Sequence, residues 1–168
     1  VEPVIKGVFE EFSDKVIDTN FLHISFAESM LKYGTDKPDL RIPIEICDVT
    51  DIFRESDFSI FAKNIEKGAV VRAVPGPKCG SRAIADRMNG WAQGEGAPGM
   101  GYIIYTEGEA RGPVAKALGS EKAEAIRAAA GVSDGDAVFF ACARADEASS
   151  LAGRARVKIG QDQDLIDK

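Results

Sequence analysis

The sequence predicts an α+β fold, a two-layer module with an antiparallel sheet, helices on one face of it, and helical segments flanking it. Two observations support this prediction. Segments with strand character and segments with helical periodicity follow one another as strands, helix, strand, helix and strand, with helices at both ends. This order contains no series of repeated parallel units, so antiparallel pairing fits it better. With 168 residues, 45% of them apolar, the chain can fill the core of one domain.

The amino-terminal part of the chain is predicted to be mainly helical. Its expected elements are a helix, a short strand and a second helix, at residues 2–13, 21–25 and 26–33. The first helix follows from apolar residues spaced at i, i+3, i+4 and i+7. Ser25 and Glu28 form a capping-box pattern that starts the second helix, and Gly34 is expected to end it.

The middle of the chain is predicted to contain most of the strands. We expect a strand, one short turn of helix and two further strands, at residues 43–49, 51–55, 59–61 and 69–74. Lys67 and Gly68 are expected to turn the chain between the last two strands. The sequence Pro75-Gly76-Pro77 then ends the series, because proline cannot continue a strand ladder.

The carboxyl-terminal half is predicted to alternate between helices and strands. Its expected elements are a helix from Ser81, a strand at 102–106, a short helix from Gly112 to Leu118, an alanine-rich helix from Ser120 to Gly131, a strand at 136–143 and a final helix from Glu147. The first of these helices has an apolar face made of Ile84, Met88 and Trp91, and Ser81 can cap its amino terminus.

Composition excludes several classes of protein. The net charge of −6 argues against a general phosphate-binding surface, although it allows a local basic face. No apolar stretch reaches the roughly 18–20 residues that span a membrane, and no signal peptide opens the chain. Cys47, Cys79 and Cys142 lie far apart without Cys-x-x-Cys spacing, so we expect reduced apolar residues rather than a disulfide frame or a zinc site. A cytoplasmic protein is therefore expected.

Two segments could suggest a phosphate site. Residues 94–99 match Gly-x-Gly-x-x-Gly, but a predicted helix precedes them and a strand follows, the reverse of a dinucleotide-binding unit, so we expect a turn. Residues 76–82 place two cations ahead of a helix, where an ordinary N-cap is favoured over a phosphate contact. Arg154, Arg156 and Lys158 are expected to be solvated. No nucleophile–base pair, metal cluster or phosphate loop can be assembled, so we predict no catalytic and no metal-ligating residues.

The most informative segment is the run at residues 33–41, Tyr-Gly-Thr-Asp-Lys-Pro-Asp-Leu-Arg, which follows a predicted amphipathic helix. Hydrophobic burial cannot explain five polar or charged side chains around one proline. The run resembles the Tyr-Gly-Ser-Asp-Lys-Pro-Asp-Leu-Arg signature of bacterial-type aspartyl-tRNA synthetases, with Thr35 in the place of serine. Further segments resemble the same family, at residues 3–12, 21–30, 46–53, 112–116, 134–140 and 151–160. The glycine-rich turn departs from the family, because Pro98 and Met100 stand where lysine and leucine are typical.

The resemblance implies a parent protein that activates aspartate with ATP and magnesium, transfers it to tRNA and works as a homodimer. It divides the chain into a catalytic-core segment following class II motif 2 at 1–43, a GAD-like insertion domain at 44–145 and a return segment into the catalytic core at 146–168. The GAD domain also occurs in the B subunit of the tRNA-dependent amidotransferase, but the 33–41 run belongs to the synthetase pattern. The family's ATP- and aspartate-binding residues lie outside these segments, so we expect an interior fragment that is itself non-catalytic.

The resemblance leaves the contribution of the insertion open between two roles. In the family it lies near the tRNA acceptor end, and Lys37, Arg41, Lys78 and Arg82 are expected to contact phosphate or to dock against the rest of the synthetase core. The alternative is a structural or protein-interaction module that stabilises the core or the dimer without touching RNA. The sequence does not decide whether the parent charges only tRNA(Asp) or also tRNA(Asn).

Overall fold

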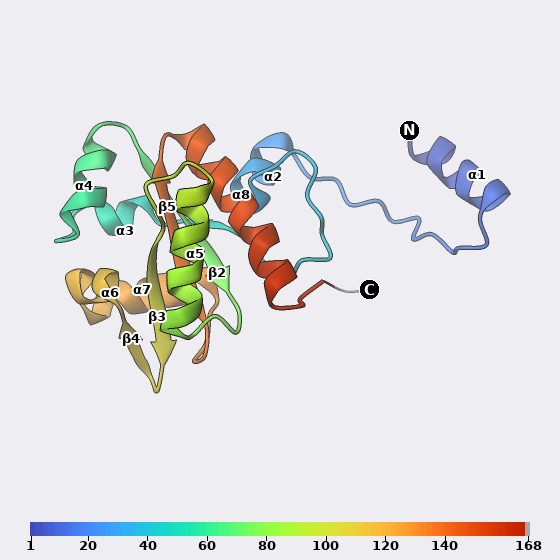
Figure 1. Ribbon diagram of the computed structural model, residues 1–168. Coiled ribbons are helices and arrows are strands. Elements are labelled where there is room, and N and C mark those ends of the chain that lie inside the picture. The colour runs from blue at the N-terminus through green and yellow to red at the C-terminus, as the bar shows by residue number, and fades with distance from the viewer. Residues whose placement is uncertain (167–168) are drawn as a thin grey trace.

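A five-stranded antiparallel sheet forms the centre of the computed structural model, which describes residues 1–166. Its strands are β1 (Cys47–Asp48), β2 (Val70–Gly76), β3 (Gly101–Thr106), β4 (Glu109–Arg111) and β5 (Ala137–Ala143). They lie in the order β1-β2-β5-β3-β4, so β5, the last strand in the sequence, occupies the middle of the sheet (Figure 1). Phe139 of β5 pairs with Val74 of β2 on one side and with Tyr102 of β3 on the other.

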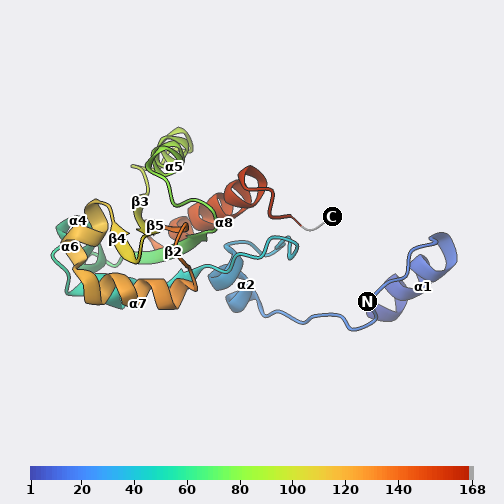
Figure 2. The ribbon, with the colours of Figure 1, turned by 90° about the horizontal axis from the view of Figure 1, so that it is seen from below.

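Helices cover both faces of this sheet (Figure 2). The first face carries α3 (Thr50–Arg54), α4 (Ser59–Glu66), α6 (Pro113–Leu118) and α7 (Ser120–Ala130). The second face carries α5 (Arg82–Gly94) and α8 (Ala145–Asp162), and α2 (Phe26–Tyr33) packs against α8. Alternate residues of β5 supply both cores, because Val138 and Phe140 point to the first face while Phe139 and Ala141 point to the second.

The predicted α+β class with an antiparallel sheet is confirmed, but the prediction of two layers with helices on one face is wrong. α5 and α8 bury the second face of the sheet, opposite α3, α4, α6 and α7. The sequence of β5, Ala-Val-Phe-Phe-Ala-Cys-Ala, is apolar at consecutive positions, which is typical of a strand covered on both sides. The helices therefore enclose the sheet instead of leaving one face open.

Most predicted elements are confirmed to within a few residues, and three predicted strands are not. The exceptions are residues 21–25, which form no strand, 43–49, of which only β1 pairs, and 59–61, which begin α4. The helix replaces the third strand because Phe58, Phe61 and Ile65 recur at helical spacing and share one face. Phe61 packs against Phe53 of α3 with ring centroids 5.1 Å apart, so tertiary contacts select the helix.

α1 (Glu2–Phe12) stands away from the sheet and its covering helices (Figure 1). It is amphipathic, but none of its own residues is buried. The exposed apolar side chains of its face are Val4, Ile5, Val8, Phe9 and Phe12. Residues 13–25 join α1 to α2 without regular secondary structure. Within residues 1–166 the apolar face of α1 therefore has no partner, and no helix in that range is long and apolar enough to cross a membrane.

Candidate functional site

The 33–41 loop leaves the end of α2 and lies directly against α8. Gly34 ends α2 in the left-handed region, with φ at 70°, which favours glycine. A Cβ atom added at Gly34 would lie 2.7 Å from the Cα atom of Gly153 in α8, and closer still to the carbonyl oxygen of Ser149. A Cβ atom at Gly153 would in turn lie 2.8 Å from the carbonyl oxygen of Gly34. The two glycines therefore let the segments before and after the sheet pack main chain to main chain.

Arg156 of α8 holds the backbone at the base of this loop. Its Nε donates to the carbonyl oxygen of Ile44 at 2.6 Å, and its Nη2 donates to those of Asp39 and Ile42 at 2.9 and 2.7 Å. The guanidinium lies over the ring of Tyr33, 4.9 Å from its centroid. Arg156 is only 1% exposed, so the expectation of a solvated residue is wrong. Burial lowers the pKa of its guanidinium, but carbonyl oxygens surround the charge and arginine stays protonated in proteins.

The loop also carries its own polar contacts. Arg41 donates from Nε and Nη2 to the two carboxylate oxygens of Asp39, at 2.9 and 2.7 Å. Hydrogen bonds from the Arg41 side chain and backbone lower the pKa of Asp39 to about 2. The hydroxyl of Ser29, which is buried in α2, donates to the carbonyl oxygen of Thr35 at 2.7 Å. These contacts shape the outer part of the loop, while Arg156 fixes its base.

Lys37 is the most exposed cation of the loop. Its side chain is 86% exposed, and it pairs only loosely with neighbouring Asp36, whose carboxylate oxygen lies 3.8 Å away. Lys37 lines a cavity of about 530 Å³ together with Trp91 of α5 and Arg154 and Lys158 of α8. The structure therefore brings this predicted site residue beside two cations of the last helix.

Lys78 and Arg82 lie elsewhere, at the turn between β2 and α5. Lys78 has a φ of 61°, and its backbone N–H donates to Oδ1 of Asp136 at 2.9 Å. Arg82 has an 86% exposed side chain, and its Nε lies 3.7 Å from Asp86. It lines a different cavity, of about 390 Å³, with Arg111. The four predicted residues therefore lie in two separate segments, Lys37 and Arg41 in the 33–41 loop and Lys78 and Arg82 between β2 and the start of α5.

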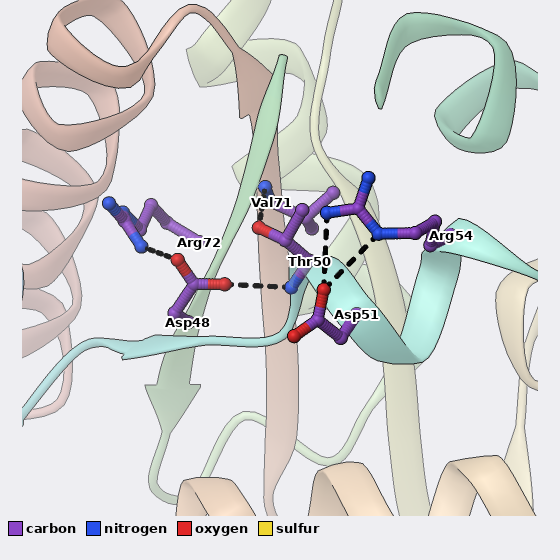
Figure 3. A network of polar contacts seen from close by, with 6 residues as sticks. All are labelled: Asp48, Thr50, Asp51, Arg54, Val71 and Arg72. Carbon is purple, nitrogen blue, oxygen red and sulfur yellow. Dashed lines mark hydrogen bonds and ion pairs between the residues drawn. The ribbon is translucent and has the colours of Figure 1, made fainter. Parts of the chain in front are cut away.

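A polar junction ties β1, α3 and β2 together at the edge of the sheet (Figure 3). The carboxylate of Asp48 accepts from Nη1 of Arg72 and, at 2.8 Å, from the backbone N–H of Thr50. The hydroxyl of Thr50 accepts from the N–H of Val71 at 2.9 Å. In the part of the chain that the structure describes, Nε of Arg72 is the one buried side-chain nitrogen without a hydrogen-bond partner. These contacts join elements, and none of them presents a nucleophile with a base.

The cysteine thiols and the carboxylates of the described residues form neither a reactive thiol site nor a metal site. Burial raises the pKa of both Cys47 and Cys79 to about 11, so these thiols stay protonated near neutral pH. Across residues 1–166 no group of three or more histidine, cysteine, aspartate or glutamate side chains is arranged to hold a metal ion. The prediction that residues 94–99 form a turn is confirmed, because α5 ends at Gly94 and β3 starts at Gly101.

Sequence reasoning missed Arg72 and Arg156, although helical spacing carried a signal for the second. Ala152 and Ile159 stand four residues before and three residues after Arg156, and both are buried in the second core. Arg156 therefore lies on the buried face of α8 by position, and only its charge suggested solvent. Arg72 likewise interrupts the otherwise apolar strand β2.

The comparisons with known proteins agree with the resemblance that residues 33–41 indicate. The sequence profile of the family described as GAD domain matches residues 61–152. Proteins named Aspartate–tRNA(Asp/Asn) ligase are 51% identical in Rickettsia africae, 53% in Paracoccus denitrificans and 54% in Rhodopseudomonas palustris. The alignments cover 100% of this chain and 29%, 30% and 29% of those proteins.

The chain thus spans less than a third of the length of the curated relatives that it matches. The profile match, from residue 61 to residue 152, includes β2, β3, β4 and β5 together with α5, α6 and α7. It therefore contains four of the five strands and lies in the enclosed sheet rather than in α1 or the 33–41 loop. Because this match takes up more than half of the 168 residues, the chain belongs to the GAD domain family.

Proposed function

We propose that this chain is part of an aspartate–tRNA ligase, a class II aminoacyl-tRNA synthetase that attaches aspartate to tRNA at the expense of ATP. The observation that carries the proposal is the identity of 51–54% to such ligases over the whole chain. Because their name includes both aspartate and asparagine tRNA, we extend the proposal to charging of tRNA(Asn) as well as tRNA(Asp). The parent is proposed to be a cytoplasmic homodimer.

Catalysis itself is assigned to the part of the parent outside this chain. The described residues do not fit magnesium, because no cluster of three or more suitable side chains occurs among them, and no step is assigned to them through magnesium or ATP. The proposed division is a catalytic-core segment at 1–43, the insertion at 44–145 and a return segment at 146–168. Purified chain is expected to form no aspartyl-adenylate, and measurable adenylate formation by the chain alone would contradict this.

The exposed face of α1 supports the proposal of a larger parent. Phe12 and Val4 are 76% and 68% exposed, although they belong to the apolar side of an amphipathic helix. Apolar side chains in such a row are normally covered in a folded protein. We propose that the remaining catalytic core of the ligase covers them, which agrees with the placement of residues 1–43 outside the insertion.

We further propose that the insertion helps to place the acceptor stem of tRNA through Lys37, Arg41, Lys78 and Arg82. The 86% exposure of the Lys37 and Arg82 side chains supports phosphate contact. The alternative, a structural or protein-interaction module, is favoured by one observation at Arg41, whose guanidinium is already occupied by Asp39. The net charge of −6 also limits any RNA contact to a local surface.

Binding of an acceptor-stem RNA to the parent at several salt concentrations separates these roles. Lys37→Gln is expected to weaken binding and to reduce the slope of log K against log salt by about 0.9, one phosphate contact. The matched control is Lys63→Gln, which removes another exposed lysine charge, from α4 on the opposite face of the sheet. If both variants bind like the unmodified parent, the structural alternative replaces the tRNA role.

A further inference from the structure

Three carbonyl oxygens converge on one guanidinium at the base of the 33–41 loop. They belong to Asp39, Ile42 and Ile44, and the two isoleucines are 3% and 1% exposed. Among the described residues no strand pairs with the segment 39–46, so a sheet ladder does not satisfy these oxygens. The N–H groups of Ile42 and Ile44 donate to the oxygens of Asp39 and Ile42, at 3.3 and 2.9 Å, and Arg156 gives each of these two oxygens a second donor. The buried oxygen of Ile44 accepts from Nε of Arg156, and a buried carbonyl group left without a donor is costly.

A guanidinium suits this task better than an ammonium group. Its planar fork donates from Nε and Nη2 in fixed directions, which matches acceptors that come from different points of the backbone. The ring of Tyr33 covers the face of the same group. Lysine at this position keeps the charge but loses both the fork and the planar contact with the ring.

The contacts of Arg156 reach across most of the sequence. Its acceptors lie 112–117 positions before it in the sequence, and all five strands of the sheet come between them and Arg156 along the chain. The backbone of the loop is therefore set by α8, which places Lys37 beside Arg154 and Lys158 in one cavity. Lys158 is held by Asp162 at 2.6 Å and Arg154 is paired with Glu95, whereas the carboxylate nearest to Lys37 is 3.8 Å away. Of these three cations, Lys37 is therefore the least closely paired with a carboxylate and the most available to bind an anion.

We infer that Arg156 is a positioning residue for tRNA: it holds the 33–41 loop so that Lys37 meets the phosphate backbone. The inference rests on the proposed function, because it assigns Lys37 to tRNA. Arg156 itself does not reach the RNA, since it is buried beneath the loop. Its effect on binding therefore passes entirely through the conformation of the loop.

The kinetic test uses the complete ligase. Arg156→Lys is expected to raise KM for tRNA several-fold, and to do so more than it lowers the rate of aspartyl-adenylate formation, which needs no tRNA. Combining it with Lys37→Gln tests whether the effect on tRNA binding acts through Lys37. If Arg156→Lys already moves Lys37 away from the phosphate, removing the Lys37 charge should weaken tRNA binding little further. The double variant should therefore resemble Arg156→Lys alone instead of showing the product of the two effects. Arg144→Lys is the matched control, because it makes the same charge-conserving change at an exposed guanidinium at the amino-terminal end of α8.

Hydrogen exchange on the 168-residue chain gives a second measurement that does not depend on tRNA. Arg156→Lys should speed exchange of the amides at residues 35–41 and leave those of β5 unchanged. Tyr33→Leu should give a weaker form of the same effect, and Tyr33→Phe, which keeps the ring, should give none.

The outcomes separate the inference from the proposed function. Unchanged exchange at residues 35–41 in Arg156→Lys overturns the inference, and so do multiplicative effects of the Arg156 and Lys37 substitutions. If exchange speeds up but Lys37→Gln leaves KM for tRNA unchanged, the tRNA role of Lys37 fails and the inference fails with it, leaving only a structural contact. If Arg156→Lys unfolds the chain, the two Tyr33 variants decide the question by the same measurements.

Discussion

Replacing Gly34 with alanine tests the close approach of α2 and α8. Gly34 has a φ of 70°, and an added methyl group would meet the main chain of α8, with the Cα and N of Gly153 both 2.7 Å away. A main-chain atom cannot rotate aside as a side chain can. The two helices must therefore separate, or the end of α2 must change conformation.

The chain provides a matched control for the backbone part of this cost. Gly131 ends α7 with a φ of 63°, and a Cβ atom there would meet nothing within 4 Å. Gly131→Ala should therefore cost about 1 kcal/mol, the strain of alanine in the left-handed region. Gly34→Ala adds overpacking of roughly 1–3 kcal/mol, so its expected total is about 2–4 kcal/mol.

Urea unfolding followed by far-ultraviolet circular dichroism measures both variants. The expected result is a lower midpoint for Gly34→Ala than for Gly131→Ala, with similar slopes. Gly153→Ala probes the same contact from α8, where helix propensity alone would make alanine stabilising by roughly 1 kcal/mol. Equal losses for Gly34→Ala and Gly131→Ala, or a gain in Gly153→Ala, would show that the helices do not touch in this way.

Three further predictions concern single groups. Arg41 lowers the pKa of Asp39 from 3.8 to about 2. The pair therefore contributes its full stabilisation of the fold above pH 3.8, and this contribution is lost as the pH falls through about 2. Arg41→Gln should raise the pKa of Asp39 towards 3.8 in a carboxyl NMR titration, and an unchanged value would exclude the pair. Cys79, with a pKa of about 11, should react at pH 8 with a thiol reagent about a hundredfold more slowly than in urea, and equal rates would contradict its burial. Ser25→Ala, which removes the cap of α2, should lower the unfolding free energy by about 1 kcal/mol in urea titrations, whereas Ser120→Ala, at a position without a side-chain cap, should not.

Helices and turns were predictable from the sequence where the signal is local. Ser25 accepts the N–H of Glu28, Gly34 ends α2, and Ser81 caps α5 by accepting the N–H of Ile84, all as the residue types indicate. The turn at residues 94–99 was predictable because a helix precedes these residues and a strand follows them, which is the reverse of the order in a dinucleotide-binding unit. Such features depend on neighbours within a few positions, and these are visible in the chain itself.

Short apolar segments were less predictable, because burial does not distinguish a strand from a helix over three residues. Residues 59–61 became the start of α4 once Phe61 could pack on Phe53 and Phe140. The second helical layer was missed for a related reason. The apolar run of β5 indicated burial on both faces, but the sequence does not state which helices lie on each side.

The sequence by itself determined the α+β class, the limits of most helices, and the resemblance carried by residues 33–41. The tertiary structure alone revealed that Lys37 shares a cavity with α8 and that Arg156 holds the loop from below. The physical reason is that a charge is placed by its partners, and those of Arg156 lie more than a hundred residues away in the chain. Local pattern describes which face a residue occupies, whereas only folding brings three distant carbonyl oxygens to one guanidinium.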